Sequence, residues 1–174
     1  MQNNFLQPTL KGESVTLIPL ELSHFEKLYQ AASDPLIWAG HPSKDRYKKD
    51  VFTNLFEDSM DSKGAMVIIE NSSGRFLGST RFYNYDEAKS ELCVGYTFLI
   101  REVWGGKTNR EVKTLVLQHA FQYVSTVWFH VDKSNLRSQA AMKKIGATLS
   151  HEEDVEFNGQ VSRYVFFKME KGEE

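Results

Sequence analysis

A glycine-containing turn that joins an apolar strand to an amphipathic helix constrains this chain more than any other feature. The apolar segment VGYTFLI covers Val94 to Ile100, and WGGKTNREVK, from Trp104 to Lys113, supplies the turn and the start of the helix. At such a junction the first N–H groups of the helix have no helical partner, and the helix dipole favours negative charge. The order of elements therefore predicts an anion site, with a phosphate-bearing ligand as first candidate.

The glycine pair also has a simpler interpretation. Two glycines before a helix supply backbone angles that other residues avoid, so a plain turn is the alternative. Only one residue separates Gly105 from Lys107, which does not fit the eight-residue phosphate loop ending in Gly-Lys-Ser/Thr, and GxGxxG does not fit either. A protein that uses this turn to bind ATP is therefore disfavoured.

Length and composition predict a single domain over residues 1–174. The chain is 41% hydrophobic and 25% charged, which is typical of a globular protein with a sizeable core. Its formal net charge of -2 provides no overall basic field, which argues against a dedicated nucleic-acid binder.

Cysteine content and hydropathy suggest a cytoplasmic location. Cys93 is the single cysteine, so an intrachain disulfide is excluded, and its apolar strand favours a buried structural thiol over a nucleophile. No apolar run reaches the roughly 18 residues of a membrane span. The N-terminal segment also lacks the pattern of a signal peptide, so neither a membrane nor secretion is expected.

The hydrophobic periodicity predicts an α/β fold with a mixed, largely antiparallel sheet and helices on both faces. Helices are expected at 23–32, with Ser23 and Glu26 as a capping box, at 44–60, after the glycine turn, and at 136–145. Strands are expected at 14–20, 65–70, 76–83, 91–100, 127–131, 149–157 and 161–169. Asp34-Pro35 ends the first helix, and Asn158-Gly159 joins the last two strands.

These elements and their residues resemble the GNAT superfamily of N-acetyltransferases. Within it the chain looks like the branch that contains ribosomal-protein-alanine and related small-amine acetyltransferases. The match covers nearly the whole chain. It is carried by Gly78, VGYT from Val94 to Thr97, Trp104-Gly105, Asn109, Glu111, Lys113, His119-Ala120-Phe121, Asn135, Ser138, Ala141, KIGA from Lys144 to Ala147, Asn158-Gly159 and Arg163.

The resemblance implies about seven strands and about four helices, with the fourth and fifth strands splayed apart. The gap would take the pantetheine arm of acetyl-CoA, paired with the backbone of Tyr96, Thr97, Phe98, Leu99 and Ile100. Its pyrophosphate would lie on the turn made by Trp104, Gly105, Gly106, Lys107, Thr108 and Asn109. The family usually has glycine where Lys107 stands, and this lysine would attract phosphate as a point charge instead.

In such enzymes an amine attacks the thioester directly. A backbone N–H near Tyr96 to Phe98 would stabilise the oxyanion, and Ser138 would protonate or hydrogen-bond the thiolate. Asn135 would orient the pantetheine or the acceptor. A helix cap for Asn135 and an ordinary first-turn serine for Ser138 are the alternatives. Glu91 and His130 are the two candidates for the base; the alternatives are a solvated strand-end charge and a core histidine.

Several aromatic and charged residues are expected around the amine acceptor, although core or rim packing explains them equally well. They are Trp38, His41, Tyr47, Tyr83, Tyr85 and Arg163. The acidic run Glu152 to Asp154 would attract a cationic amine, or is simply a solvated face. The histidines show no spacing for metal ligands, so no metal is expected.

Acetyl-CoA and a primary amine, on a protein N-terminus or a small molecule, are therefore the expected substrates. A polyamine or antibiotic acetyltransferase is the alternative within this class. A non-catalytic acyl-CoA-binding module is the alternative outside it. Dimers are common in the resembling branch, so a homodimer is one assembly that the resemblance allows.

Overall fold

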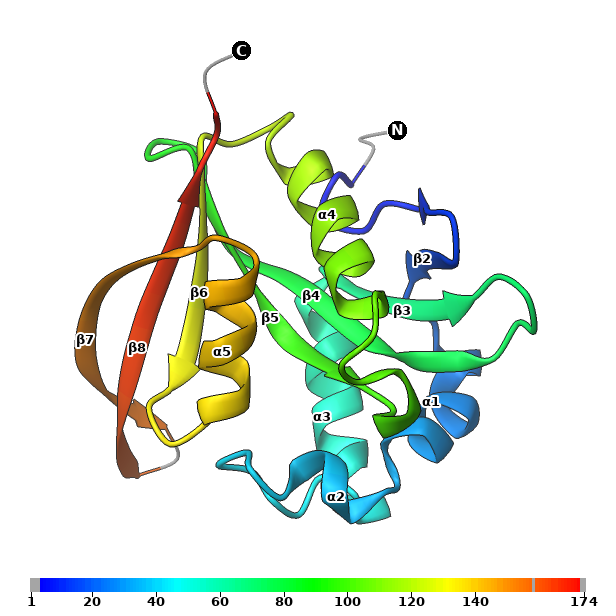
Figure 1. The fold of residues 1–174 in the computed structure, drawn as a ribbon. Coiled ribbons are helices and arrows are strands. Elements are labelled where there is room, and N and C mark those ends of the chain that lie inside the picture. The colour runs from blue at the N-terminus through cyan, green and yellow to red at the C-terminus, as the bar shows by residue number, and fades with distance from the viewer. Residues whose placement is uncertain (1–3, 158, 173–174) are drawn as a thin grey trace.

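The chain folds around one mixed sheet of eight strands, in the order β1-β2-β3-β4-β5-β6-β8-β7 (Figure 1). The computed structural model describes residues 4–157 and 159–172. The strands are β1 Leu10–Lys11, β2 Val15–Pro19, β3 Ala65–Glu70, β4 Phe76–Asp86, β5 Glu91–Leu99, β6 Thr126–Asp132, β7 Thr148–Phe157 and β8 Gln160–Glu170. The helices are α1 Phe25–Ala32, α2 Pro35–Trp38, α3 Lys49–Ser62, α4 Thr108–Ala120 and α5 Leu136–Lys144, with short 3-10 turns at Leu22–His24 and Arg101–Val103.

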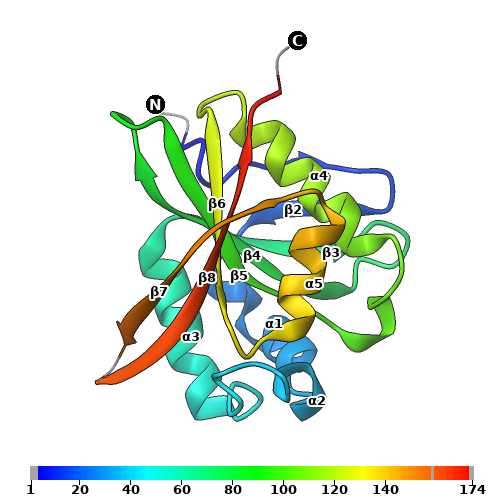
Figure 2. The same cartoon turned by 60° about the vertical axis from the view of Figure 1, so that its left-hand side comes forward.

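Two apolar cores hold the helices against the two faces of the sheet. On one face, α1, α2 and α3 pack on the sheet around Phe52, Val67 and Phe98. On the other face, α4 and α5 pack on it around Val116 and Met142. Figure 2 shows these helix groups on opposite sides of the strands, so the predicted α/β class is confirmed.

The sheet opens between β5 and β6, its parallel neighbours. Their pairing comprises Glu91 with Thr126, Leu92 with Val127 and Cys93 with Trp128. Beyond these residues β5 stays with β4, whereas β6 stays with β8 as far as Asp132. The predicted splay is therefore confirmed, and Figure 1 shows the two strands diverging. The strand numbers are one higher than expected because β1, a two-residue strand, was not predicted.

A β-bulge in β5 accompanies the splay. The register with β4 passes from Arg81–Gly95 to Ser79–Phe98, so β5 carries one extra residue there. Tyr96 in the bulge has φ +53, a strained value for a residue with a side chain. The Arg81 guanidinium lies 3.8 Å from the centre of the Tyr96 ring and donates to Asp58 at 2.9 Å, so it links the bulge to α3.

The expected helix at 44–60 begins late, at Lys49. Residues 44–47 form turns, with Lys48 N–H donating to the Asp45 carbonyl at 2.9 Å, and Lys48 itself is extended with ψ 135. Apolar periodicity begins only at Val51, so the earlier polar residues contained no helix signal.

Two further helix boundaries differ from the sequence prediction. The 3-10 turn Leu22–His24 precedes α1, and Glu21 N–H donates to His24 Nδ1 at 3.1 Å, so the capping box from Ser23 to Glu26 does not form the start. Asp34-Pro35 ends α1 but also begins α2, because the Asp34 carboxylate caps Leu36 N–H at 2.9 Å. Of the expected Asn158-Gly159 turn, Gly159 has φ +76, whereas Asn158 lies outside the described residues.

Within the part of the chain that the structure describes, no helix is both long and apolar enough to cross a lipid bilayer.

Gly78 permits the close approach of β4 and β5 beside the bulge. A Cβ at this position would lie 1.9 Å from the Phe98 carbonyl oxygen. Gly78→Ala should therefore lower the free energy of unfolding by about 2–4 kcal/mol, measured by denaturant titration. Gly40→Ala is the matched control, because a Cβ there meets no atom within 4 Å, and it should change stability little. Equal effects of the two variants would contradict this account.

Candidate active site

Two adjoining pockets occupy the splay. The larger pocket, of about 580 Å³, lies between the start of α4 and α5, and the smaller pocket, of about 360 Å³, lies between the α2–α3 loop and β8. Both are lined by a common set of residues: Trp38, His41, Thr97, Lys113, Asn135, Ser138 and Met142. Two molecules, one bound in each pocket, would therefore meet at this shared wall.

The predicted glycine turn forms one end of the larger pocket. Gly105 has φ +74, which favours glycine, and α4 begins at Thr108. The first i−4 bond runs from Glu111 N–H to the Lys107 carbonyl at 3.0 Å. Amides that precede it have no partner in the helix, which leaves them available to an anion. The turn residues that line the pocket are Trp104, Gly105, Gly106, Lys107 and Asn109, whereas Thr108 does not line it.

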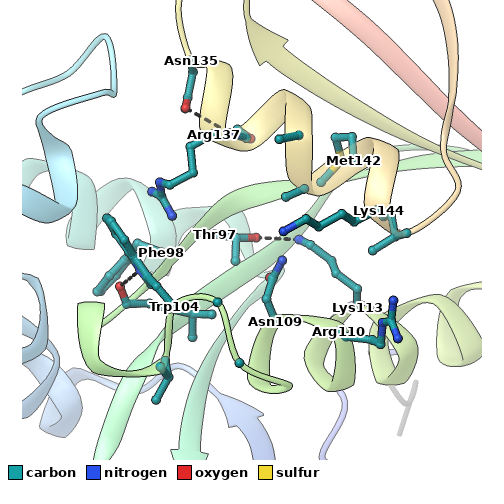
Figure 3. Close-up of a pocket in the computed structure, with 18 of the residues that line it drawn as sticks. Thr97, Phe98, Trp104, Asn109, Arg110, Lys113, Asn135, Arg137, Met142 and Lys144 are labelled. Carbon is teal, nitrogen blue, oxygen red and sulfur yellow. Dashed lines mark hydrogen bonds between the residues drawn. The ribbon is translucent and has the colours of Figure 1, made fainter.

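The charge of the larger pocket suits an anion. Its lining includes five cationic residues, Lys107, Arg110, Lys113, Arg137 and Lys144, and no Asp or Glu among residues 4–157 and 159–172. The side chains approach the cavity from α4 and from α5 (Figure 3). Burial lowers the pKa of Arg137, whose guanidinium lies 3.7 Å from the Trp104 ring centre and so joins α5 to the turn. The pocket therefore matches a phosphate group in charge and in donors.

The edge of β5 that faces the splay carries fewer free backbone groups than expected. Ile100 N–H donates to the Leu77 carbonyl of β4, and strand alternation then directs the backbone of Thr97 and Leu99 toward the cleft. The Leu99 carbonyl already accepts from Trp104 Nε1 at 2.9 Å. Of the five expected residues, Thr97, Phe98 and Leu99 line the larger pocket, Tyr96 lines the smaller pocket, and Ile100 lines neither.

Asn135 and Ser138 lie where α5 begins, at the shared wall of both pockets. Asn135 Oδ1 accepts from Ser138 N–H at 3.2 Å, which is the helix cap of the alternative interpretation. This bond uses the Ser138 amide and not its hydroxyl, and Ser138 lines both pockets. The cap therefore positions the Ser138 hydroxyl and does not compete with a role for it.

Lys113 is a buried cation at the centre of the site. The residue is 4% exposed, and its Nζ donates to Thr97 Oγ1 at 3.0 Å (Figure 3). No ion pair joins it to any residue that the structure describes, and burial lowers the pKa of its amine to about 8. The sequence placed Lys113 in the family resemblance without a role. Its position four residues before Leu117 puts it on the apolar face of α4, which was the available signal.

The smaller pocket contains His130, one of the two expected bases. Burial lowers the pKa of His130, so its ring is neutral near pH 7. His130 Nε2 lies 3.6 Å from Cys93 Sγ, and burial raises the pKa of the Cys93 thiol to about 12. Cys93 therefore remains a thiol, which suits the structural role. Tyr83 also lines this pocket, and burial raises its pKa, so its hydroxyl stays protonated.

Four of the residues expected as the base or around the acceptor do not line either pocket. Glu91 lies where β5 and β6 still pair, and its carboxylate accepts from Trp128 Nε1 at 2.9 Å. Tyr85 packs edge-on against Phe5 with ring centres 5.0 Å apart. Tyr47 accepts from the Tyr29 hydroxyl through its carbonyl.

Arg163 is the fourth of these residues. It forms ion pairs with Glu152 and Asp154 of β7, so the acidic run is partly neutralised by this strand pairing. Its neighbours Ser162 and Tyr164 line the smaller pocket, because alternate side chains of β8 point to opposite faces.

The structure also brings charged residues to the smaller pocket that sequence reasoning did not select. Arg46 comes from the turn before α3, and Asp132 ends β6. Arg46 lies in the segment that was expected to be helical but forms turns, so the position of its side chain was not predicted. Among the described residues, no group of three or more His, Cys, Asp or Glu side chains could hold a metal ion.

The burial of Lys113 predicts a pH-dependent cost to stability. Below about pH 8 the amine is protonated in both states, so the full cost of burying the charge applies. As the pH rises from about 8 toward 10.5, the folded state releases the proton first and the cost falls. Lys113→Met should therefore raise the free energy of unfolding at pH 7 by about 1–3 kcal/mol. In denaturant titrations this gain should shrink by pH 10, and a constant difference would contradict the burial argument.

Comparison with known proteins places this geometry in a family. The family model described as an acetyltransferase (GNAT) domain matches residues 14–148. Among solved structures, the chain is similar to a GCN5-related N-acetyltransferase from Brucella melitensis, with a TM-score of 0.84, 16% identity and coverage of 94% of this chain and 79% of that one.

The chain is also similar to RimJ from Mycobacterium smegmatis in complex with CoA-disulfide, with a TM-score of 0.68, 14% identity and coverage of 94% and 86%. A comparison with curated protein sequences finds no match. At these identities the solved structures show the fold alone, whereas the family model spans most of the sequence. The predicted family is confirmed, and the chain belongs to the GNAT family of acetyltransferases.

Proposed function

We propose that this protein transfers the acetyl group of acetyl-CoA to a primary amine by direct attack of the amine on the thioester. The observation that carries the proposal is the meeting of two differently built pockets at Thr97, Lys113 and Ser138. The larger pocket offers cations and free amides to CoA. The smaller pocket offers a separate route to the same wall, which an acceptor needs.

The turn before α4 supports the assignment of the larger pocket to CoA. The amides that precede the Glu111–Lys107 bond would bind the pyrophosphate, and Lys107 would add a point charge where the family usually has glycine. Arg110, Arg137 and Lys144 would neutralise the remaining phosphate charge. The similarity to RimJ, which was solved with CoA-disulfide, agrees with this assignment.

The splay supports the placement of the pantetheine arm. An extended amide chain would bind the free edge of β5 as an added strand, at the backbone groups of Thr97 and Leu99. The Leu99 carbonyl already bonds the Trp104 indole, so the arm would use the remaining groups. This arrangement directs the thioester toward Lys113 and Ser138, where the two pockets meet.

The same wall supplies groups for the chemical step. The amine nitrogen forms a bond to the thioester carbon, and the resulting oxyanion accepts a hydrogen bond from the Thr97 amide. The C–S bond then breaks, and the thiolate takes a proton from the Ser138 hydroxyl, which regains one from solvent. His130, held neutral by burial, accepts the proton that the amine must lose. The Lys113 ammonium lowers the energy of both developing negative charges.

Incubation with labelled acetyl-CoA and a panel of amines tests the function. The parent should acetylate at least one primary amine, and Gly105→Asp should reduce both transfer and the affinity for acetyl-CoA by at least about 10-fold, because it places a carboxylate beside phosphate. Gly105→Asn is the matched control, since it has nearly the same shape and the same backbone strain without the charge.

Calorimetric titration with acetyl-CoA separates the alternatives. Tight binding without transfer to any amine would favour a non-catalytic acyl-CoA-binding module. Transfer restricted to polyamines or aminoglycosides would favour the small-molecule alternative. If Gly105→Asp binds acetyl-CoA as the parent does, the phosphate turn is wrongly assigned.

Ser138→Ala tests the proton donor. The Asn135 cap uses the Ser138 amide, so the variant should fold and bind acetyl-CoA normally. Turnover should fall by about 10- to 100-fold, because the thiolate loses its nearest proton. Steady-state kinetics and acetyl-CoA affinity, measured together, separate these effects. Unchanged turnover would remove Ser138 from the mechanism.

A further inference from the structure

Arg46 places an unneutralised guanidinium in the smaller pocket. It lies between α2 and α3, half-buried, and forms no ion pair with any residue within 4–157 or 159–172. Its contacts are the Trp38 ring, 5.6 Å away, and the His41 Nε2 atom at 3.4 Å. By contrast, Arg81 is neutralised by Asp58 at 2.9 Å and also donates to Ser59 Oγ. A charge that is kept partly out of water without a partner points to a ligand that supplies one.

The tautomer of His41 makes the contact with Arg46 a pair of donors. Ser43 N–H donates to His41 Nδ1 at 2.9 Å, so Nδ1 carries no proton. Burial lowers the pKa of His41 to about 4, and the neutral ring must therefore carry its proton on Nε2. Nε2–H and the Arg46 guanidinium then face each other at 3.4 Å, and no described residue supplies an acceptor to either. Two converging donors, one of them charged, form a half-built anion site.

The opposite charge lies elsewhere in the same pocket. Asp132 ends β6, and its Oδ1 accepts from the Ser134 amide and hydroxyl at 2.8 and 2.6 Å. Among the described residues no ion pair reaches Asp132, so its carboxylate stays available to a cation. Asp132, Arg46 and His41 all line the smaller pocket. The smaller pocket thus brings the cationic Arg46 and the anionic Asp132 to one cavity, in addition to the buried Lys113 that it shares with the larger pocket.

We propose that the amine acceptor carries a carboxylate, which binds Arg46 and His41 while its ammonium group is first attracted by Asp132. The inference rests on the proposed acetyl transfer and names the class of its acceptor. A guanidinium binds a carboxylate through two parallel N–H groups, and the imidazole N–H adds a third donor. A diamine or polyamine would leave Arg46 unpaired and bring a second cation next to it. Free amino acids and peptides with an acidic first side chain share the required chemistry.

Matched acceptors provide the test. Glycine, β-alanine and 4-aminobutyrate are each compared with their carboxamides, and a peptide that begins with Asp is compared with one that begins with Asn. For at least one pair, Arg46→Gln should lower the ratio of kcat/KM, carboxylate over carboxamide, by about 10- to 100-fold. Differences in amine basicity cancel, because the ratio is compared between the parent and the variant. The pair that responds distinguishes free amino acids from peptides.

Two further variants keep the result interpretable. Arg163→Gln removes an exposed arginine of β8 that lies outside both pockets, and it should leave the ratio unchanged. Arg46→Lys retains the positive charge but lacks the two parallel N–H groups of the guanidinium, and it should lower the ratio less than Arg46→Gln does. Thermal melting and acetyl-CoA binding show whether Arg46→Gln folds. If it does not fold, Arg46→Lys is the variant with which the ratio is tested. An unchanged ratio in Arg46→Gln for every pair would overturn the proposal.

Binding of the expected products separates this inference from the proposed function. N-acetylated amino acids and their carboxamides are titrated into the CoA-loaded protein, which requires no turnover. A carboxylate preference that Arg46→Gln abolishes would support the anion site even if no amine were acetylated. Equal binding of both series to the parent, together with equal acetylation rates, would refute it.

Discussion

The separation of β5 from β6 is the constraint on which the rest of the site depends. Each strand follows a different partner beyond Cys93 and Trp128, because β5 remains paired with β4 and β6 remains paired with β8. The bulge at Tyr96 adds one residue to β5. The Arg81 guanidinium, which is paired with Asp58, lies against the Tyr96 ring. Unpaired strand edges are costly unless something bonds them, so the open edge is itself an argument for an extended amide ligand.

Burial of the Lys113 amine beside the opening lowers the stability of the fold. An aliphatic side chain on this face of α4 would continue the core formed by Val112, Val116 and Leu117. The chain instead buries an amine whose only described hydrogen-bond partner is a threonine hydroxyl. Such a charge opposes folding, but in the proposed mechanism it would lower the energy of the negative charge that develops beside it. Stability and chemistry therefore make opposite demands on this one side chain.

The sequence predicted the parts of the molecule that are encoded by local patterns. The turn before α4 depends on two glycines and a helix start, and alternation located every long strand within three residues. The short elements β1 and α2 were missed because a strand of two residues and a helix of a single turn are too short to show a hydrophobic period. Sequence alternation does not say which face of a strand points to the pocket, because that depends on how the strand pairs in the sheet. Arg163 was expected at the site, but its neighbours Ser162 and Tyr164 line the pocket instead. Glu91 lies on the expected strand, yet at the end where β5 and β6 remain paired.

The proposed acceptor side was least predictable because its polar and charged side chains come from segments that meet only in the folded chain. Arg46 lies in irregular turns, Asp132 at a strand end and Tyr164 on the terminal hairpin. None of these positions belongs to a motif, and nothing in the local sequence relates them. The proposed CoA side would instead rely on backbone amides and on several interchangeable cations, so a lysine at position 107, where the family usually has glycine, would be tolerated. The proposed acceptor side relies on a few individual charges, so in this proposal a change at Arg46 or Asp132 would alter which amine fits while the fold and the glycine turn stay the same.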